Sequence, residues 1–351
     1  MSGLDRRPLG DTEVSVSSLC LGTMMFGDQI GEEAAFRQMD RCFDFGIDFF
    51  DTAEIYTIPP KAETQGDSER IVGKWMKERG CRDKIVLATK VSGRSGNQWL
   101  RGTKEKRVTP AQIREAVEDS LERLQTDYID LYQIHWPDRR VAMFGSEPNG
   151  FVAQDNADAV PIAEQLGGMA ELVREGKIRY VGLSNETAWG VMEFVRAAER
   201  EGLPRVVSIQ NAYSLVNRTF EQALAEVAME EKVGLLAYSP IAQGSLSGKY
   251  LGGQKPKGSR GEMFGRLDRY KTPNAEAAIA AYVEVARDMG VHPAALAMQF
   301  VTTRPFVTSN IFGANGDEQL DVIFNSLEVE LTTEVMQRIT DIHKRYTNPC
   351  P

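Results

Sequence analysis

The chain alternates short apolar runs, rich in β-branched residues, with longer segments in which apolar residues recur at helical spacing. Short runs of this kind favour buried strands, and apolar positions three and four residues apart favour the helices that cover them. The clearest helix is expected to open at Thr109, where Thr109-Pro110-Ala111-Gln112 supplies an N-cap, a proline at the first helical position and a capping glutamine. Its apolar stripe consists of Ile113, Val117, Leu121 and Leu124.

Eight strand-then-helix units follow from this alternation. A turn signal at Gly10-Asp11, before the first unit, is compatible with an N-terminal β-hairpin. The predicted strands are residues 18–21, 47–50, 85–89, 128–134, 178–183, 206–209, 234–238 and 307–312. The predicted helices lie near residues 32–45, 69–78, 109–124, 162–173, 187–201, 218–231, 274–289, after 292–293, and near 317–326 and 332–345.

A succession of alternating strands and helices requires a parallel sheet with right-handed crossovers. Eight such units close into an α/β (β/α)₈ barrel, or TIM barrel, whose usual size is about 250 residues plus insertions. A doubly wound open sheet is the competing fold, but no G-x-G-x-x-G follows the first run. We therefore predict one barrel domain over residues 1–351, with long loops on its C-terminal face at 91–108, 138–160 and 252–272.

Composition narrows the class of protein. Hydrophobic residues make up 42% and charged residues 26% of the chain, values typical of soluble globular proteins. The net charge of −9 argues against general binding to nucleic acid or to anionic membranes. Four cysteines without metal-ligand spacing, and the absence of an apolar N-terminal segment, favour a cytoplasmic protein with reduced thiols and no bound metal.

Basic residues are concentrated in one segment. Residues 244–271 contain seven basic side chains against two acidic ones. Such a run is either a solvated loop or a cradle for a polyphosphate ligand. The basic residues are Lys249, Lys255, Lys257, Arg260, Arg266, Arg269 and Lys271.

Three of the predicted strands end on titratable residues, namely Asp51, Lys90 and His135, and Tyr56 follows just after the second strand. Barrel enzymes build their sites at the C-terminal ends of several strands, so these four side chains are expected to meet there. Reduction of a carbonyl by hydride needs an acid at the carbonyl oxygen. We expect Lys90 to lower the pKa of the Tyr56 phenol, Asp51 to orient Lys90, and His135 to hydrogen-bond the same oxygen.

Longer motifs around these residues resemble the aldo-keto reductase family over nearly the whole chain, from about Leu9 to Leu331. Residues 46–56 resemble the family's aspartate-to-tyrosine motif, 87–90 its lysine strand and 127–137 its histidine signature. The similarity is to a bacterial member of the branch that includes potassium-channel β-subunit-like and Tas-like oxidoreductases. It implies reduction of an aldehyde or ketone, a small-molecule carbonyl substrate, by direct hydride transfer.

The resemblance also implies NADP(H), with NADH use as an alternative, extended across the barrel mouth. Tyr238 would stack on the nicotinamide, whose carboxamide Ser184, Asn185 and Gln210 would hydrogen-bond. Gly22, Thr23, Met24 and Asp51 would lie beside it. The implied phosphate contacts are Ser239, Pro240, Ile241, Gln243, Gly244, Lys249 and Arg260, and the implied adenosine contacts are Gly313, Asn315 and Gln319.

At two points the chain departs from the family pattern. Asn315 stands where many members carry a basic or hydroxyl residue, and Val322 and Ile323 replace a frequent Glu-Asn pair. Lys249 or Arg260 would then supply the countercharge for a 2′-phosphate. The substrate pocket is expected to be lined by Phe26, Trp99 and Trp136.

Two other functions stay open at this point. One is a regulatory subunit that binds nucleotide with little turnover, and the other is a barrel lyase or isomerase that uses Lys90 as a Schiff base. The physiological substrate and direction are not encoded in recognisable motifs, and a homo-oligomer is compatible with the sequence.

Overall fold

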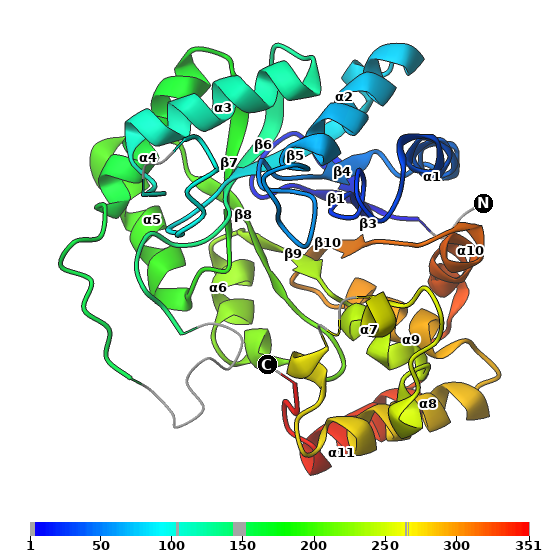
Figure 1. Ribbon diagram of the computed structural model, residues 1–351. Coiled ribbons are helices and arrows are strands. Elements are labelled where there is room, and N and C mark those ends of the chain that lie inside the picture. Colours follow the sequence, from blue (N-terminus) through cyan, green and yellow to red (C-terminus); the bar gives the residue numbers. More distant parts are fainter. Residues whose placement is uncertain (1–3, 103–104, 143–151, 264, 266, 351) are drawn as a thin grey trace.

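Eight parallel strands form a closed barrel surrounded by helices, which confirms the predicted (β/α)₈ fold (Figure 1). The computed structural model describes residues 4–102, 105–142, 152–263, 265 and 267–350. The strands follow the chain around the barrel, and β10 closes it by pairing with both β9 and β3. They are β3 (Leu19–Gly22), β4 (Phe49–Asp51), β5 (Val86–Val91), β6 (Ile129–Ile134), β7 (Ile178–Ser184), β8 (Val206–Ala212), β9 (Gly234–Tyr238) and β10 (Val307–Phe312).

An antiparallel hairpin of β1 (Arg6–Pro8) and β2 (Ser15–Ser17) precedes the barrel, as the turn signal indicated. Gly10 sits in the turn with φ +63°, and a side chain there would collide with the backbone of Val207. Leu9 and Val16 are fully buried and pack with the apolar residues inside the barrel. The hairpin therefore packs against the interior of the barrel through these two side chains.

The helices pack around the strands with an apolar layer between them (Figure 1). Thr109 caps its helix as expected, because Thr109 Oγ1 accepts from Gln112 N. Thr332 caps the last helix in the same way, with Oγ1 accepting from Val335 N. The helices are α1 (Glu32–Phe45), α2 (Asp67–Arg79), α3 (Pro110–Leu124), α4 (Ile162–Arg174), α5 (Ala188–Glu201), α6 (Leu224–Glu230), α7 (Arg260–Met263), α8 (Ala275–Asp288), α9 (Pro293–Thr302), α10 (Asp317–Asn325) and α11 (Thr333–Arg345).

The prediction of one helix over residues 218–231 was wrong. A 3₁₀ turn, Thr219–Gln222, is followed by α6, and Ala223 between them has φ −143°, outside the helical range. The Glu221 carboxylate accepts from Arg218 and from Tyr213 Oη of the preceding loop. These contacts hold the first turn against the end of β8 and prevent a continuous helix.

In the part of the chain that the structure describes, no helix combines the length and the apolar character that crossing a bilayer demands. The long segments predicted on the C-terminal face contain little regular structure where they are described. Residues 103–104, 143–151, 264 and 266 of these segments, including the basic Arg266, lie outside the described residues.

Candidate active site

Asp51, Lys90, His135 and Tyr56 meet at the C-terminal mouth of the barrel. Asp51 ends β4, Lys90 is the penultimate residue of β5, and His135 follows β6 directly. Parallel pairing of Asp51 with Ala88 and of Lys90 with Gln133 places these strand ends at neighbouring heights. The strand order therefore brings together residues that lie up to 84 positions apart in the chain.

Lys90 is the centre of this group. Its Nζ donates to Asp51 Oδ2 at 2.6 Å and to the carbonyl oxygen of Thr52 at 2.7 Å, and lies 3.4 Å from Tyr56 Oη. Lys90 is fully buried, whereas Tyr56 keeps 8% of its surface exposed. The ammonium is thus held by fixed oxygens on the inner side, while the phenol beside it retains contact with solvent.

Lys90 lowers the pKa of the Tyr56 phenol as expected, but the net shift of that pKa is upward. Burial raises the pKa of the phenol because it disfavours the phenolate, and the Asp51 carboxylate raises it further; Lys90 only opposes these effects. Burial alone would lower the pKa of Lys90, but Asp51 and Tyr56 outweigh it and raise that pKa. At neutral pH the pair is therefore a protonated phenol beside an ammonium ion.

His135 stands on the other side of the phenol. The two rings lie edge to face, with centroids 5.7 Å apart, and the Trp136 ring stacks on the imidazole. Burial and the nearby Lys90 ammonium hold the pKa of His135 well below its usual value. The imidazole is therefore neutral at pH 7 and has one N–H to donate.

Two glutamines support Asp51 from across the barrel interior. Gln210 Nε2 donates to Asp51 Oδ1 at 2.8 Å, and Gln133 Nε2 donates to the same oxygen at 3.1 Å. Gln133 was not among the predicted site residues. The available signal was Gln133 itself, a polar residue in a buried strand two positions before His135.

The residues predicted to hold the nicotinamide form one hydrogen-bonded group. Asn185 Nδ2 donates to the backbone oxygen of His135 and to Ser184 Oγ, while Asn185 Oδ1 accepts from Tyr238 Oη at 2.7 Å. Ser184 Oγ donates to the backbone oxygen of Gln210. Four of the implied contact residues thus lie together beside His135.

On the opposite side, the end of β3 adjoins Asp51. The backbone N–H and the hydroxyl of Thr23 both donate to the carbonyl oxygen of Asp51 at 3.0 Å. Gly22 packs so closely on β10 that a side chain there would crowd Ile311 and Phe312. Met24, next along the chain, accepts from the backbone N–H of Ile58 through its carbonyl oxygen.

The segment after β9 folds into a tight loop. Ser239, Gln243 and Gly244 have φ values of +58°, +55° and +92°, and Ile241 O accepts from Gly244 N. Lys249 folds back over this loop. Its Nζ lies so close to Gly244 that a Cβ atom on Gly244 would be only 3.0 Å away. Pro240 lies within the loop, whereas Arg260 opens α7 eleven residues beyond Lys249. Ala242 is left-handed as well, so three consecutive left-handed residues follow Ile241. Tight turns of this kind can bring backbone N–H groups close together, where they bind anions.

The predicted adenosine end lies between β10 and α10. Gly313 and Asn315 occupy the connection, and Gln319 Oε1 accepts from Asn315 N at 2.9 Å. A cavity of about 160 Å³ opens between this connection and the start of α1. Sequence reasoning missed the opposite wall, which includes Gln29 and the nearly buried Gln38, whose Oε1 has no partner among the described residues.

The three predicted pocket residues differ in position. Trp136 is half-buried and stacks on His135, and Trp99 is half-buried in the segment between β5 and α3. Gly93 of that segment touches Trp136, since a side chain there would overlap the Trp136 carbonyl. Phe26 is 1% exposed and packs in the apolar layer between barrel and helices.

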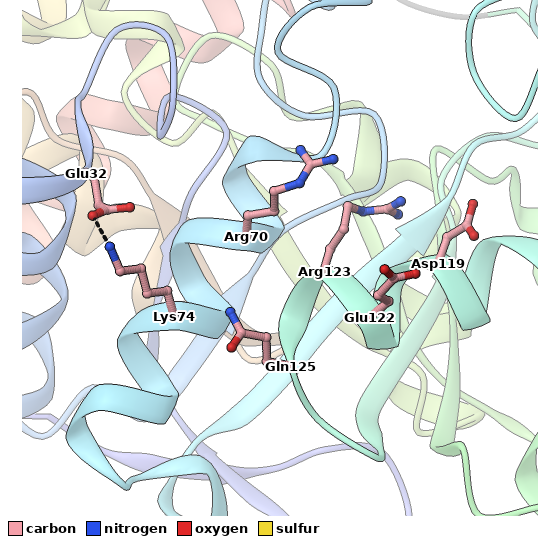
Figure 2. Close-up of a pocket in the computed structure, with 7 residues that line it drawn as sticks. All are labelled: Glu32, Arg70, Lys74, Asp119, Glu122, Arg123 and Gln125. Carbon is pink, nitrogen blue, oxygen red and sulfur yellow. Dashed lines mark hydrogen bonds and ion pairs between the residues drawn. The ribbon is translucent and has the colours of Figure 1, made fainter.

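A cavity of about 530 Å³ is a surface groove between α2 and α3 and contains none of the predicted site residues (Figure 2). Its cations are already paired: Lys74 with Glu32, Arg70 with Asp67, and Arg123 with the buried Glu69. The groove is therefore a charged helix surface, and it is separate from the group of Asp51, Tyr56, Lys90 and His135 at the barrel mouth. Among the described residues, no cluster of His, Cys, Asp or Glu side chains is arranged to hold a metal ion.

A closed (β/α)₈ barrel whose mouth joins a buried Asp-Lys pair to a phenol and an imidazole is the architecture that the motifs implied. The family model for the aldo/keto reductase family matches residues 18–344, and the chain belongs to that family.

Among curated proteins, the chain is 47% identical over 340 residues to Protein tas of Escherichia coli (strain K12), a match that covers 97% of this chain and 98% of that protein. It is 35% identical over 340 residues to the uncharacterized oxidoreductase YrpG of Bacillus subtilis (strain 168), covering 95% and 94%. It is 32% identical over 265 residues to norsolorinic acid reductase B of Dothistroma septosporum, covering 72% and 60%.

Proposed function

We propose that the protein is an NADPH-dependent oxidoreductase that reduces an aldehyde or ketone to the alcohol, reversibly, with Tyr56 as the general acid. The observation that carries this proposal is the position of Lys90 Nζ, 2.6 Å from Asp51 and 3.4 Å from the Tyr56 hydroxyl at the barrel mouth. Family membership and the reductase and oxidoreductase names of its relatives support the reaction class.

When bound, a reduced nicotinamide supplies the hydride that forms the new C–H bond at the carbonyl carbon. The Tyr56 hydroxyl donates its proton to the carbonyl oxygen as negative charge develops there. An alkoxide is far more basic than a phenolate, so this transfer is favourable even though burial raises the pKa of Tyr56. The adjacent Lys90 ammonium stabilises the phenolate until it takes a proton from solvent.

Neutral His135 acts on the same carbonyl oxygen as a hydrogen-bond donor and does not transfer its proton. An imidazole N–H directed at the carbonyl oxygen strengthens its hydrogen bond as charge accumulates, which lowers the barrier. The Asn185 side chain holds the backbone of His135 in place at 2.9 Å. Gln133 and Gln210 keep Asp51 directed at Lys90.

The residues around the barrel mouth suit the phosphate groups and the adenosine end of a dinucleotide cofactor. Left-handed backbone at Ser239, Gln243 and Gly244, with Lys249 folded over it, suits a pyrophosphate. The cavity beside the N-terminus of α10 suits the adenosine end, and the unpartnered Gln38 Oε1 can accept from an amino group there. Lys249 and Arg260 are our candidates for the countercharge of a 2′-phosphate.

The Schiff-base alternative is disfavoured by the state of Lys90. A nucleophilic amine must be unprotonated, whereas Asp51 and Tyr56 raise the pKa of Lys90 and keep it charged. A regulatory subunit with little turnover would not require all four side chains around the same mouth.

Fluorescence titration with NADPH and NADH, followed by a panel of aldehydes and ketones, tests the proposal. We expect tighter binding of NADPH and steady consumption of it when a carbonyl substrate is present. Binding without turnover of any carbonyl would favour the regulatory function. Trapping of a carbonyl compound on Lys90 by borohydride, without nucleotide binding, would favour the lyase.

A further inference from the structure

Glu54 lies between Asp51 and Tyr56 and is fully buried, yet the reaction described above does not use it. Its carboxylate oxygen Oε1 accepts from the backbone N–H of Ser92 at 2.6 Å and from the guanidinium of Arg101. Its backbone N–H donates to Lys90 O at 3.3 Å. Glu54, which belongs to the segment that carries Asp51 and Tyr56, thus also contacts the end of β5 and Arg101.

Arg101 belongs to the segment that joins β5 to α3, which carries the predicted pocket residue Trp99. Its side chain is 2% exposed, its backbone is left-handed at φ +48°, and its Nη2 lies 3.4 Å from Gln112 Oε1. The Gln112 side chain also bonds Arg107 N and Glu105 O. The Glu54–Arg101 pair is therefore one end of a connected network that joins Ser92 and Arg101 to Glu105 and Arg107.

A buried ion pair is a strong positional constraint because neither partner can stay buried without the other. Burial raises the pKa of the Glu54 carboxyl, and the Arg101 charge opposes that shift. Four more polar atoms of this region are buried without partners among the described residues: Glu54 Oε2, Arg101 Nε, Ser92 Oγ and Tyr132 Oη. The segment has other polar anchors, chiefly Arg107 on Asp138 and Arg94 on Asp158, whereas the Glu54 carboxylate binds it to the segment that carries Tyr56.

The same segment begins at the barrel mouth, directly after β5. Gly93 packs directly on the Trp136 carbonyl, and Arg107 binds Asp138 of the neighbouring segment. A shift of residues 92–102 would move Trp99 and loosen the packing on Trp136. Tyr56 lies two residues beyond Glu54 and would lose part of its support at the same time.

We propose that Glu54 is a positioning residue, which through its ion pair with Arg101 sets residues 92–102 relative to Tyr56 and so determines the size of carbonyl substrate admitted. This inference rests on the proposed reductase function. It assigns Glu54 no contact with substrate or cofactor. Its effect is exerted through the position of Trp99 and of the Tyr56 segment.

The test compares Glu54→Gln, Arg101→Gln and the double variant in the full-length protein. Glutamine at position 54 keeps the size and the acceptor for Ser92 N, so only the charge is lost. We expect each single variant to raise KM for a bulky aromatic aldehyde about tenfold more than for a small aliphatic one, because the unpaired charge displaces the segment. NADPH affinity should change less than about twofold, and the double variant should recover part of the lost kcat/KM.

Hydrogen exchange supplies a readout that does not depend on activity. Amides of residues 92–102 and 105–109 should exchange faster in both single variants, and the double variant should be closer to wild type. Exposed Glu199→Gln and Arg196→Gln are the matched controls and should leave exchange unchanged. If wild type reduces no carbonyl, the proposed function fails while the exchange arm still decides the positioning role.

Two results would overturn the proposal. One is unchanged exchange in the segment together with an equal loss of kcat for small and large substrates, which would mean that Glu54 acts directly on Tyr56. The other is a double variant that is at least as impaired as the worse single variant in folding yield, amide exchange and kcat/KM. That result would show that the charges of Glu54 and Arg101 are not coupled.

Discussion

At the scale of single residues, the protonation states of Tyr56 and His135 define what the site can do. Burial raises the pKa of Tyr56, so the phenol stays protonated through neutral pH. It loses its proton only when the pH rises above the usual pKa of a tyrosine. Because the pKa of His135 is held well below its usual value, the imidazole is neutral over the same range. Both groups are therefore in their working states at pH 7.

These directions predict the pH profile of carbonyl reduction. The rate constant for reduction should be flat between about pH 6 and 8, since neither group titrates there, and should fall only in strongly alkaline solution as the phenol ionises. Steady-state kinetics under saturating cofactor would check this. A falling limb centred near pH 6.5 would show that His135 titrates normally and that its assigned neutral state is incorrect.

The Asp51–Lys90 pair also predicts a stability effect. Asp51→Asn leaves the fully buried Lys90 ammonium without its counter-ion, so we expect a loss of about 3–5 kcal/mol in the free energy of unfolding. Urea denaturation followed by circular dichroism measures this loss of stability. The control is Asp11→Asn, which removes a carboxylate from an exposed ion pair. A loss no greater than that of the control would mean that the Thr52 carbonyl alone suffices for Lys90.

Sequence reasoning found the four central residues because each follows or ends an apolar run, and parallel strands must present those ends at one rim. It missed Gln29 and Gln38 because a glutamine in a turn or helix carries no pattern that separates a site from the surrounding structure, and it left the signal of Gln133 in strand β6 unused. The sign of the Tyr56 shift was also missed, since it depends on burial that the sequence does not reveal.

At the scale of elements, strands were predictable and the connections were not. Apolar runs located all eight barrel strands within a few residues, whereas the break at Ala223 accompanies a contact between the Glu221 carboxylate and Tyr213 of the preceding loop. Residues 92–102 and 105–109 contain no helix or strand. Their path is set by Arg101, Gln112 and the close packing of Gly93, which are visible only in three dimensions.

Gly93 gives an element-scale prediction. In Gly93→Ala the added methyl would overlap the Trp136 carbonyl, so the segment must shift, at a cost of about 1–3 kcal/mol. Gly96→Ala in the same segment meets nothing within 4 Å and serves as the control. Thermal unfolding should show a lower Tm for the first variant only. Equal Tm values would indicate that the segment adapts without strain.

The basic segment after β9 predicts cofactor preference. Arg260→Ala should weaken NADPH binding about tenfold while changing NADH binding little, because a charge-assisted contact to a 2′-phosphate would be lost. Fluorescence titration with both nucleotides gives the ratio. An unchanged ratio would remove Arg260 as the phosphate partner and leave Lys249 as the candidate.

At the scale of the whole molecule, eight alternating units were enough to predict a closed barrel, and closure is what creates the site. Asp51, Lys90 and the two supporting glutamines come from β4, β5, β6 and β8, so their contacts cross the barrel interior. Neither the N-terminal hairpin nor the groove between α2 and α3 contributes to the mouth. The chemistry is therefore a property of the closed sheet.

The removal of one oxygen atom tests this account most directly. Tyr56→Phe keeps the ring against Lys90 and His135 but deletes the hydroxyl proton that the proposed reaction transfers. Single-turnover hydride transfer from NADPH to a reactive aldehyde, measured with the NADPH dissociation constant on the same sample, should slow by about 10²- to 10⁴-fold with binding changed less than about twofold. A variant that reduces the aldehyde at the wild-type rate would contradict the account.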